Sequence, residues 1–588
     1  MLRKLLKCVG EYRGVTLWTM VLVVFEVAID CVIPFIITNL VNRIQDGCGV
    51  PEIVRYGAVL VVLSLFSLLF GTLAGSTCAK ASAGFARNLR RSLFYRVQDF
   101  SFENIDRFST ASLVTRMTTD VGNVQMAFMM IIRMAIRSPL MILFSFIMAF
   151  VLGGSMAIFY AVLIPFLGFL LFLIIRRVMP LFTRVFRKYD RLNESVEENV
   201  RGMRVVKSFV REDHEREKFG RASDDVCNDF TRAEKILALN NPLMQFCLYA
   251  LMVVVIFFGS RKIVASGGTT MNVGHLSGLL TYGTQILFNL MMVSFVFVMV
   301  TMSLESAKRI CEVLDTESTL VSPAEAVGEV PDGSVDFDRV SFKYSATAER
   351  MALAGVDLHI KSGETIGVIG GTGSSKTTLV QLIPRLYDAT EGTVRVGGRD
   401  VREYDLEALR NQVAVVLQKN LLFSGTIREN LRWGNPDATD EEIREACRLA
   451  QADEFIREFP DGYDTHIEQG GTNVSGGQKQ RLCIARALLK KPKILILDDS
   501  TSAVDTKTDA LIRRGLRQYL PETTKIIIAQ RFSSVQDADR IVMMAEGRVA
   551  AVGTHEELLA GNTMYREIWD SQSRSGADRQ EGGEGNAD

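Results

Sequence analysis

Six long apolar runs in the first half of the chain limit its fold more than any other feature. A helix that spans a bilayer needs roughly 20 mostly apolar residues. Runs of that length cover residues 15–41, 54–74, 126–152, 156–175, 237–263 and 279–302. Because the first run is itself long enough to span, we interpret it as a retained membrane helix and not as a cleavable signal peptide. The first half of the chain therefore predicts an α-helical transmembrane bundle of six helices.

Basic residues gather in two long connections, one after the second apolar run and one after the fourth. The positive-inside rule then places both connections and both termini in the cytoplasm, as in a multi-pass protein of the plasma (inner) membrane. Apolar residues recur at helical spacing in both connections, so we expect the helices to continue beyond the lipid and to reach a cytoplasmic domain. The basic residues are Arg87, Arg90, Arg91, Arg96, Arg107 and Arg116 in the first connection, and Arg184, Arg187, Lys188, Arg201, Arg204, Lys207 and Arg211 in the second.

Four charged residues interrupt the apolar runs at matched spacings. Glu26 and Asp30 lie four apart in the first run, and Arg133 and Arg137 lie four apart in the third. Charges at membrane depth are costly, so they are usually paired or face a cavity. Three interpretations stay open: an ion-pair cluster between two helices, a cation or proton site, and positions closer to the membrane surface. Pairing of the carboxylates with Arg133 or Arg137 is the prediction that can be tested.

The composition changes class near residue 320, where apolar runs end and Pro323, Gly328 and Pro331 appear. We therefore predict a membrane domain over residues 1–315, a linker over 316–333 and an α/β domain over 334–574. The last segment, 575–588, is Gly-rich and acidic and is predicted to be disordered. The formal net charge of the chain is zero, which argues against nucleic acid as a partner.

The second half contains a pattern typical of phosphate binding. A short apolar strand, TIGVIG, leads into a glycine-rich turn and then into an apolar helix. The glycines let backbone N–H groups face a phosphate, Lys376 supplies a cation for the β and γ phosphates, and Thr377 supplies a hydroxyl for Mg²⁺. Ser375 departs from the usual pattern, which has glycine before the lysine. The predicted loop for ATP is Gly370, Gly371, Thr372, Gly373, Ser374, Ser375, Lys376, Thr377 and Thr378.

A second apolar strand, followed by aspartate, completes the pattern of an ATPase. Ile494 to Leu497 form a run of four apolar residues, as expected of an interior parallel strand. Asp498 follows at the carboxyl end, where doubly wound sheets bind ligands, and it can hold Mg²⁺ through water. The phosphate loop and this strand together predict an ATPase that uses ATP and Mg²⁺.

Between these two motifs, NVSGGQKQRLCIARAL resembles the signature of the ATP-binding-cassette (ABC) family, with valine where leucine is commoner. The layout of six membrane helices, long intracellular extensions and one cassette resembles the ABC exporters with the multidrug-type membrane fold. The resemblance implies an ABC-type nucleotide-binding domain and a dimer in which two cassettes hold two ATP molecules head to tail. Each ATP then lies between one phosphate loop and the other chain's signature. The signature residues here are Val474, Ser475, Gly476, Gly477 and Gln478.

The resemblance also assigns roles to single residues. Tyr344 matches the aromatic residue that stacks on adenine, and Gln418 matches the glutamine that reaches Mg²⁺ and faces the intracellular helices. Ser502 to Asp505 match the loop that crosses to the opposite cassette. Two positions depart from the family. Asp499 stands where a glutamate acts as general base, and Gln530 stands where a histidine contacts the γ-phosphate.

These two departures weaken one and the same nucleotide site, whereas the signature is intact. We therefore expect one half of a heterodimeric ABC exporter, similar to the degenerate-site subunit of the bacterial multidrug-type heterodimers. Its partner would carry the glutamate and the histidine, and its substrate would be drug-like, lipid, peptide or otherwise amphipathic, moved through membrane lipid. Two alternatives remain: a homodimeric exporter with slow sites, and a regulatory or gating subunit that binds ATP without pumping.

Overall fold

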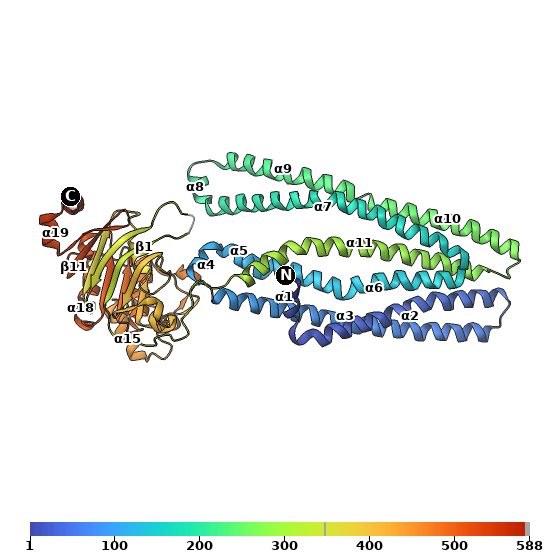
Figure 1. Cartoon of the computed structure of the whole chain (residues 1–588), viewed down its shortest axis with the longest axis horizontal. Helices are drawn as coiled ribbons and strands as arrows, with labels where there is room; N and C mark the ends of the chain where they lie inside the picture. The colour runs from blue at the N-terminus through green and yellow to red at the C-terminus, as the bar shows by residue number, and fades with distance from the viewer. Residues whose placement is uncertain (346–347, 582–588) are drawn as a thin grey trace. The chain divides into compact units, whose positions relative to one another are not determined.

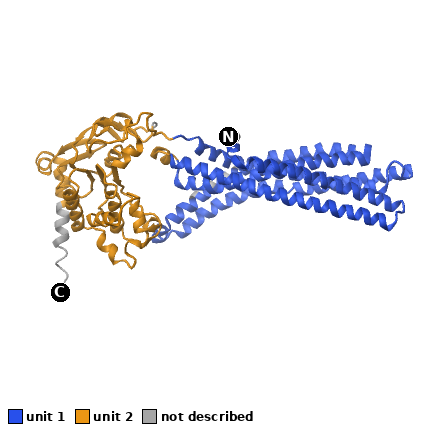
Figure 2. Ribbon diagram, turned by 90° about the horizontal axis from the view of Figure 1, so that it is seen from below, with its two compact units in different colours: residues 1–99, 108–317 blue, residues 100–107, 318–588 orange. Residues whose placement is uncertain are grey.

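A computed structural model of the chain describes residues 1–345 and 348–581. It divides into two compact units, which Figure 2 shows in blue and orange. Unit 1 contains Met1–Asp99 and Phe108–Glu317, and unit 2 contains Phe100–Arg107 and the chain from Ser318 onward.

Helices make up most of the described residues of unit 1, and each of the six predicted spans lies largely within one long helix. Five continuous helical segments are long and apolar enough to cross a membrane, and the one over residues 110–201 contains both α6 and α7. The predicted extensions are confirmed by the helix lengths, which reach 49 residues in α3 and 44 in α7. The helices are α1 (Leu2–Lys7), α2 (Arg13–Gln45), α3 (Val50–Gln98), α5 (Thr110–Thr115), α6 (Val121–Gly153), α7 (Ile158–Arg201), α8 (Met203–Ser208), α9 (Glu212–Leu237), α10 (Asn240–Ser266) and α11 (Val273–Asp315).

The membrane helices form two groups within unit 1. Helices α2, α3, α6 and α11 pack on one another, and α7 runs beside α9 (Figure 1). Small residues allow the close approaches. A Cβ on Gly278 of α11 would lie 2.3 Å from the hydroxyl of Thr38 on α2, and one on Gly274 would lie 2.1 Å from Asn42 Oδ1. Only glycine fits at such contacts, so these positions fix how closely α11 approaches α2.

Three of the four charged residues of the apolar runs, Glu26, Asp30 and Arg137, meet between α2 and α6. Arg137 Nη2 donates to Asp30 Oδ2 at 2.8 Å, and Arg137 Nε lies 3.4 Å from Glu26 Oε1. Ser67 of α3 donates a further hydrogen bond to Asp30 Oδ1 at 2.7 Å. The predicted pairing is therefore confirmed for Arg137. Arg133, one turn earlier, has no carboxylate within 4.0 Å among the described residues.

Unit 2 is an α/β domain with two main sheets, as the sequence predicted. A six-stranded sheet has the order β12-β11-β3-β10-β9-β6, in which β12 alone is antiparallel to its neighbour, and a four-stranded antiparallel sheet has the order β2-β1-β4-β5. A short pair joins β7 to β8. The strands are β1 (Val335–Phe342), β2 (Leu353–Ile360), β3 (Thr365–Gly370), β4 (Glu391–Val396), β5 (Arg399–Asp400), β6 (Val413–Val416), β7 (Gly425–Thr426), β8 (His466–Ile467), β9 (Ile494–Asp498), β10 (Thr524–Ile528), β11 (Arg540–Ala545) and β12 (Arg548–Gly553).

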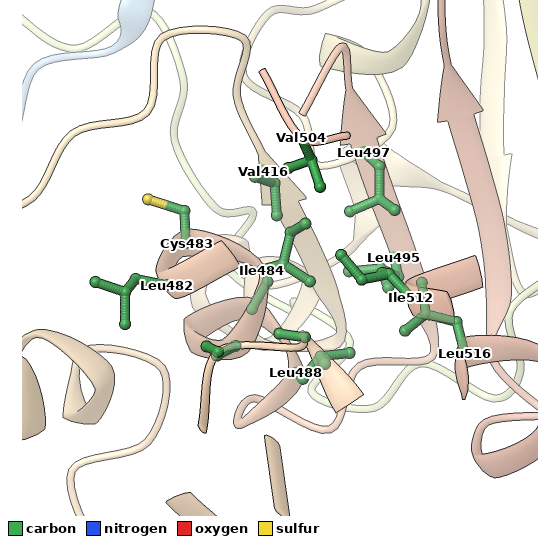
Figure 3. Close-up of a cluster of buried hydrophobic side chains, with 14 of the residues drawn as sticks. Val416, Leu482, Cys483, Ile484, Leu488, Leu495, Leu497, Val504, Ile512 and Leu516 are labelled. Atoms are coloured by element: carbon green, nitrogen blue, oxygen red, sulfur yellow. The ribbon is translucent and has the colours of Figure 1, made fainter. Parts of the chain in front are cut away.

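The helices of unit 2 cover the six-stranded sheet. Apolar side chains of α17, β9 and α18 meet in one buried cluster, which Figure 3 shows with Ile484, Leu495 and Ile512 at its centre. The cluster fixes the start of α17 and the end of β9, where two of the predicted motifs lie. The helices are α4 (Phe102–Arg107), α12 (Lys376–Gln381), α13 (Leu406–Gln412), α14 (Ile427–Arg432), α15 (Asp440–Leu449), α16 (Asp453–Glu458), α17 (Gly476–Leu488), α18 (Thr506–Tyr519), α19 (His555–Gly561) and α20 (Thr563–Glu581).

Helix α4 corrects the predicted domain boundaries. It falls inside the predicted membrane domain, 1–315, yet it packs as part of unit 2. Tyr387 Oη donates to Asp106 Oδ2 at 2.5 Å, and the rings of Phe102 and Tyr387 meet edge to face with centroids 6.0 Å apart. The hydroxyls of Ser101 and Thr319 lie 2.7 Å apart. The first long connection thus reaches the α/β domain, as expected of a helical extension.

Two further boundaries differ from the prediction. The linker predicted over 316–333 is partly ordered, because Val327 forms a parallel bridge with Tyr404 of unit 2. The tail predicted to be disordered from residue 575 is helical as far as Glu581, at the end of α20. The rest of that tail lies outside the described residues.

Candidate nucleotide-binding site

The phosphate loop joins the buried strand β3 to α12, and its backbone bends at three positive φ angles. These occur at Gly370 (154°), Gly373 (81°) and Ser375 (70°). A Cβ on Gly370 would lie 2.2 Å from the carbonyl oxygen of Met544, so the strand end leaves no room for another residue. Lys376 Nζ donates to the carbonyls of Gly370 and Gly371, both at 2.9 Å. The loop therefore curls around the lysine ammonium.

Ser375 holds a conformation that suits glycine. Its φ of 70° and ψ of 27° lie in the left-handed region, and its side chain forms no capping hydrogen bond with α12. For residues with a Cβ, this region costs roughly 1–2 kcal/mol. The serine thus stores strain in the loop, which agrees with glycine being usual at this position.

We expect Ser375→Gly to stabilise the protein by about 1 kcal/mol because it removes this strain, less a few tenths for the greater freedom of glycine in the unfolded chain. The measurement is thermal unfolding of the full-length protein in detergent. Ser375→Ala is the control, because it removes the hydroxyl and keeps the Cβ. Equal stabilisation by alanine would show that the hydroxyl, and not the backbone, is the unfavourable element.

A cavity of about 240 Å³ in front of the loop brings together motifs that are far apart in the sequence. Gln418 follows β6, Asp498 ends β9, Asp499 comes directly after it, and Gln530 follows β10. All four therefore lie at the carboxyl edge of the parallel strands. The lining residues are Gly370, Thr372, Gly373, Ser374, Ser375, Lys376, Thr377, Gln418, Asp498, Asp499, Ile528 and Gln530.

The oxygen atoms expected to hold Mg²⁺ are already close to one another. Thr377 Oγ1 donates to Asp498 at 2.9 Å and 3.1 Å from its two carboxylate oxygens. Burial raises the pKa of Asp498, although the hydrogen bond from Thr377 and the charge of Lys376 act in the opposite direction. Mg²⁺ prefers oxygen ligands and commonly combines one or two protein groups with nucleotide phosphates. Thr377, Asp498 and Gln418 fit that ion, which would supply charge stabilisation at the phosphates.

The two residues that depart from the family contact each other. Gln530 Nε2 donates to Asp499 Oδ2 at 2.9 Å. Burial raises the pKa of Asp499, and its hydrogen bonds with Gln418 and Gln530 oppose that rise. In the family, these two positions carry the general base and the histidine that contacts the γ-phosphate. Here the Asp499 carboxylate therefore accepts a hydrogen bond from the Gln530 amide. The sequence placed both in one site but gave no sign of this contact.

Tyr344 lies beside the start of the helix that follows the phosphate loop. Its hydroxyl is 2.9 Å from Thr378 Oγ1, and its ring meets those of Phe342 and Tyr387 edge to face. The side chain remains 45% exposed, so one part of the ring is open to a flat partner. Thr378 is buried and holds Tyr344 in place, so its contribution to the site is indirect. Stacking of adenine on Tyr344 stays a prediction.

The signature forms the start of α17. Ser475 caps this helix by accepting from the backbone N–H of Gln478 at 3.3 Å, and the Gln478 side chain accepts in return from the N–H of Ser475 at 2.9 Å. Ser475 and Gly476 are exposed, whereas Val474 packs partly on the apolar core. Among the described residues, none of the signature lines the cavity at the phosphate loop. Each cassette therefore presents the two motifs at separate places.

Gln480 is a residue that the sequence analysis missed. Its side chain accepts from Ala503 N at 3.0 Å and donates to Ser502 Oγ at 3.2 Å, which ties α17 to the predicted crossing loop. A Cβ on Gly477 would lie 2.9 Å from the carbonyl of Ala503, so this glycine permits the same close packing. Asp505 ends the loop by capping α18 through Thr508 N at 2.9 Å. Gln480 lies within the signature segment NVSGGQKQRLCIARAL, so its place in the sequence could have identified it.

Comparisons with known proteins agree with both units. A family model described as the ABC transporter transmembrane region matches residues 16–301, and one described as ABC transporter matches residues 353–502. The chain is 34% identical over 577 residues to YfiB of Bacillus subtilis (strain 168), an uncharacterized ABC transporter ATP-binding protein. The aligned region covers 97% of this chain and 98% of YfiB.

Two further relatives carry more specific names. The chain is 31% identical over 487 residues to the ATP-dependent lipid A-core flippase of Desulfotalea psychrophila, which covers 83% of this chain and 84% of the flippase. Among solved structures, a bacterial Atm1-family ABC exporter with ATP bound has a TM-score of 0.83 at 24% identity, covering 96% of this chain and 99% of that one. The similarity in structure supports the same fold.

Proposed function

The chain belongs to the ABC transporter family, and on that premise we propose that it is one half of a heterodimeric exporter with two unequal ATP sites. The protein is an ATPase-coupled exporter with several membrane-spanning helices and a cytoplasmic nucleotide-binding domain. In the proposal, this chain supplies a slow ATP site of its own and a working signature to the site of its partner. ATP, with Mg²⁺ at Thr377, Gln418 and Asp498, draws the two cassettes together.

The contact between Gln530 and Asp499 is the observation that supports the slow site most strongly. Aspartate is one methylene shorter than glutamate, so its carboxylate retreats by roughly 1.5 Å, and a misplacement near 1 Å can cost on the order of 100-fold in rate. Glutamine can donate a hydrogen bond but carries no charge at the γ-phosphate. Both changes affect the same step, whereas the capped signature of α17 is complete.

The substrate class follows from the family and from the relatives. We propose an amphipathic substrate, either drug-like or lipid, and the name of the Desulfotalea flippase favours lipid. A homodimer with two slow sites and a regulatory subunit that does not pump are the alternatives. Purification of the tagged chain from its native membrane distinguishes the heterodimer from the homodimer, because the heterodimer would bring a second, different half-transporter in equal amount. Transport measured with a hydrolysis-dead partner distinguishes the heterodimeric pump from the regulatory subunit.

We expect the double variant Asp499→Glu/Gln530→His to raise hydrolysis at this chain's own site by about 100-fold, and each single variant to raise it less. The readout is labelling of this chain, relative to its partner, by photoreactive azido-ATP trapped with vanadate. Gln530→Asn is the control, because it disturbs the contact with Asp499 without supplying an imidazole. No gain in the double variant would mean that the site is slow for another reason, and Ser375 would be examined next.

A further inference from the structure

A cavity in unit 1 lies around the N-terminal helix and has no role in the function proposed above. Its volume is about 770 Å³, and it is bounded by α1, the start of α2, the cytoplasmic part of α6 and the end of α11, with Phe85 of α3. The walls are apolar, and Val9, Phe128 and Ile132 are typical of them. An apolar cavity of this size suits a hydrocarbon chain better than a polar metabolite.

Three basic side chains line the same cavity, and none of the described residues that line it is acidic. Arg3, Lys7 and Arg13 form no ion pair within 4.0 Å in the part of the chain that the structure describes. Lys4, on the same short helix, pairs instead with Asp315 and does not line the cavity. The cavity therefore joins apolar walls to three uncompensated positive charges, which is the pattern of an anionic amphiphile.

The position of these basic residues along the chain indicates where an anionic amphiphile would come from. They precede and begin α2, at the end of that helix that the positive-inside rule places in the cytoplasm. Helix α1 and the start of α2 also expose apolar residues, with Leu6 57% and Leu17 64% exposed, as in a segment that lies in the membrane interface. At that depth the cytoplasmic leaflet presents anionic phosphate headgroups.

We propose that this cavity binds one anionic phospholipid of the cytoplasmic leaflet. Its phosphate is held by Arg3, Lys7 and Arg13, and one acyl chain lies against Met20, Phe128 and the neighbouring apolar walls. A zwitterionic lipid would fill the walls equally well but would leave the three cations uncompensated. Because α1 and the end of α11 bound the same cavity, the bound lipid holds these two helices together. The proposal does not depend on the heterodimer or on the transported substrate.

Native mass spectrometry of the full-length protein tests the proposal, with phosphatidylglycerol and phosphatidylcholine of equal chain length as probes. The wild type is expected to bind phosphatidylglycerol at least about tenfold more tightly, because each basic residue adds to the attraction. Arg3→Gln/Lys7→Gln/Arg13→Gln should abolish that preference. Arg90→Gln/Arg91→Gln/Arg96→Gln is the matched control, because it removes three cytoplasmic charges that do not line the cavity, exposed at Arg90 and Arg91 and partly buried at Arg96.

Absence of a preference in the wild type, or an equal loss in the control, would overturn the proposal and indicate only general attraction to the leaflet. A second measurement covers the case in which the triple variant does not fold. Phosphatidylglycerol with a photoreactive diazirine in its acyl chain should label peptides of α2 and α6 around Met20 and Ile131 in the wild type. Labelling spread evenly over the membrane helices would count against a defined site.

Discussion

Ser475→Arg is expected to remove most of the ATPase activity of the assembled transporter, although Ser475 lies in the chain with the slow site. In the proposed heterodimer, the N-terminus of α17 faces the ATP held by the partner. Its backbone N–H groups stabilise the charge that develops on the γ-phosphate. Loss of one such donor site costs about 100-fold or more in turnover, and a bulky arginine also blocks closure. Steady-state ATPase of the purified complex measures the effect.

Two variants show whether the loss comes from the site. Ser475→Arg also removes a helix cap, so Thr439→Arg is the matched control, because Thr439 forms the same capping box at α15, away from the nucleotide cavity. It should keep most of the activity. Asp499→Asn should do so too, because it affects only the slow site. If Asp499→Asn were more damaging than Ser475→Arg, the assignment of the active site to the partner would be wrong.

Arg137→Gln is expected to be among the most destabilising substitutions in the membrane unit. It leaves Glu26, which is buried, and Asp30 without their cation, and breaking one side of a buried ion pair costs about 3–5 kcal/mol. Arg133→Gln is the matched control one helical turn away, because Arg133 has no carboxylate within 4.0 Å among the described residues. Thermal unfolding of the full-length protein in detergent compares the two.

The reciprocal exchange Asp30→Arg/Arg137→Asp restores opposite charges across the same two helices, so it should recover part of the stability that either single exchange loses. Equal losses from Arg133→Gln and Arg137→Gln would instead mean that α6 tolerates no change at this depth. The ion pair would then have no special role in holding α6 to α2.

Features set by neighbouring residues could be predicted from the sequence. The six spans follow from apolar length, and the phosphate loop follows from glycine spacing between a strand and a helix. Apart from the pairing of Asp30 with Arg137, which follows from the matched spacings of the charges, contacts between distant residues could not be predicted. The hydrogen bond between Asp106 and Tyr387, which assigns α4 to unit 2, joins residues 281 positions apart. The bond between Gln530 and Asp499 depends on β9 and β10 being neighbours, which neither segment encodes alone.

The unbroken length of α3 has a mechanical consequence. At 1.5 Å per residue, its 49 residues form a rod about 74 Å long. Only Asp99 to Ser101 separate this rod from α4, which is fastened to the α/β domain. Such a rod acts as a lever: a tilt of about 5° about one end moves the other by about 6 Å, roughly one helical turn. A small change in tilt is thus magnified along α3 without any helix melting.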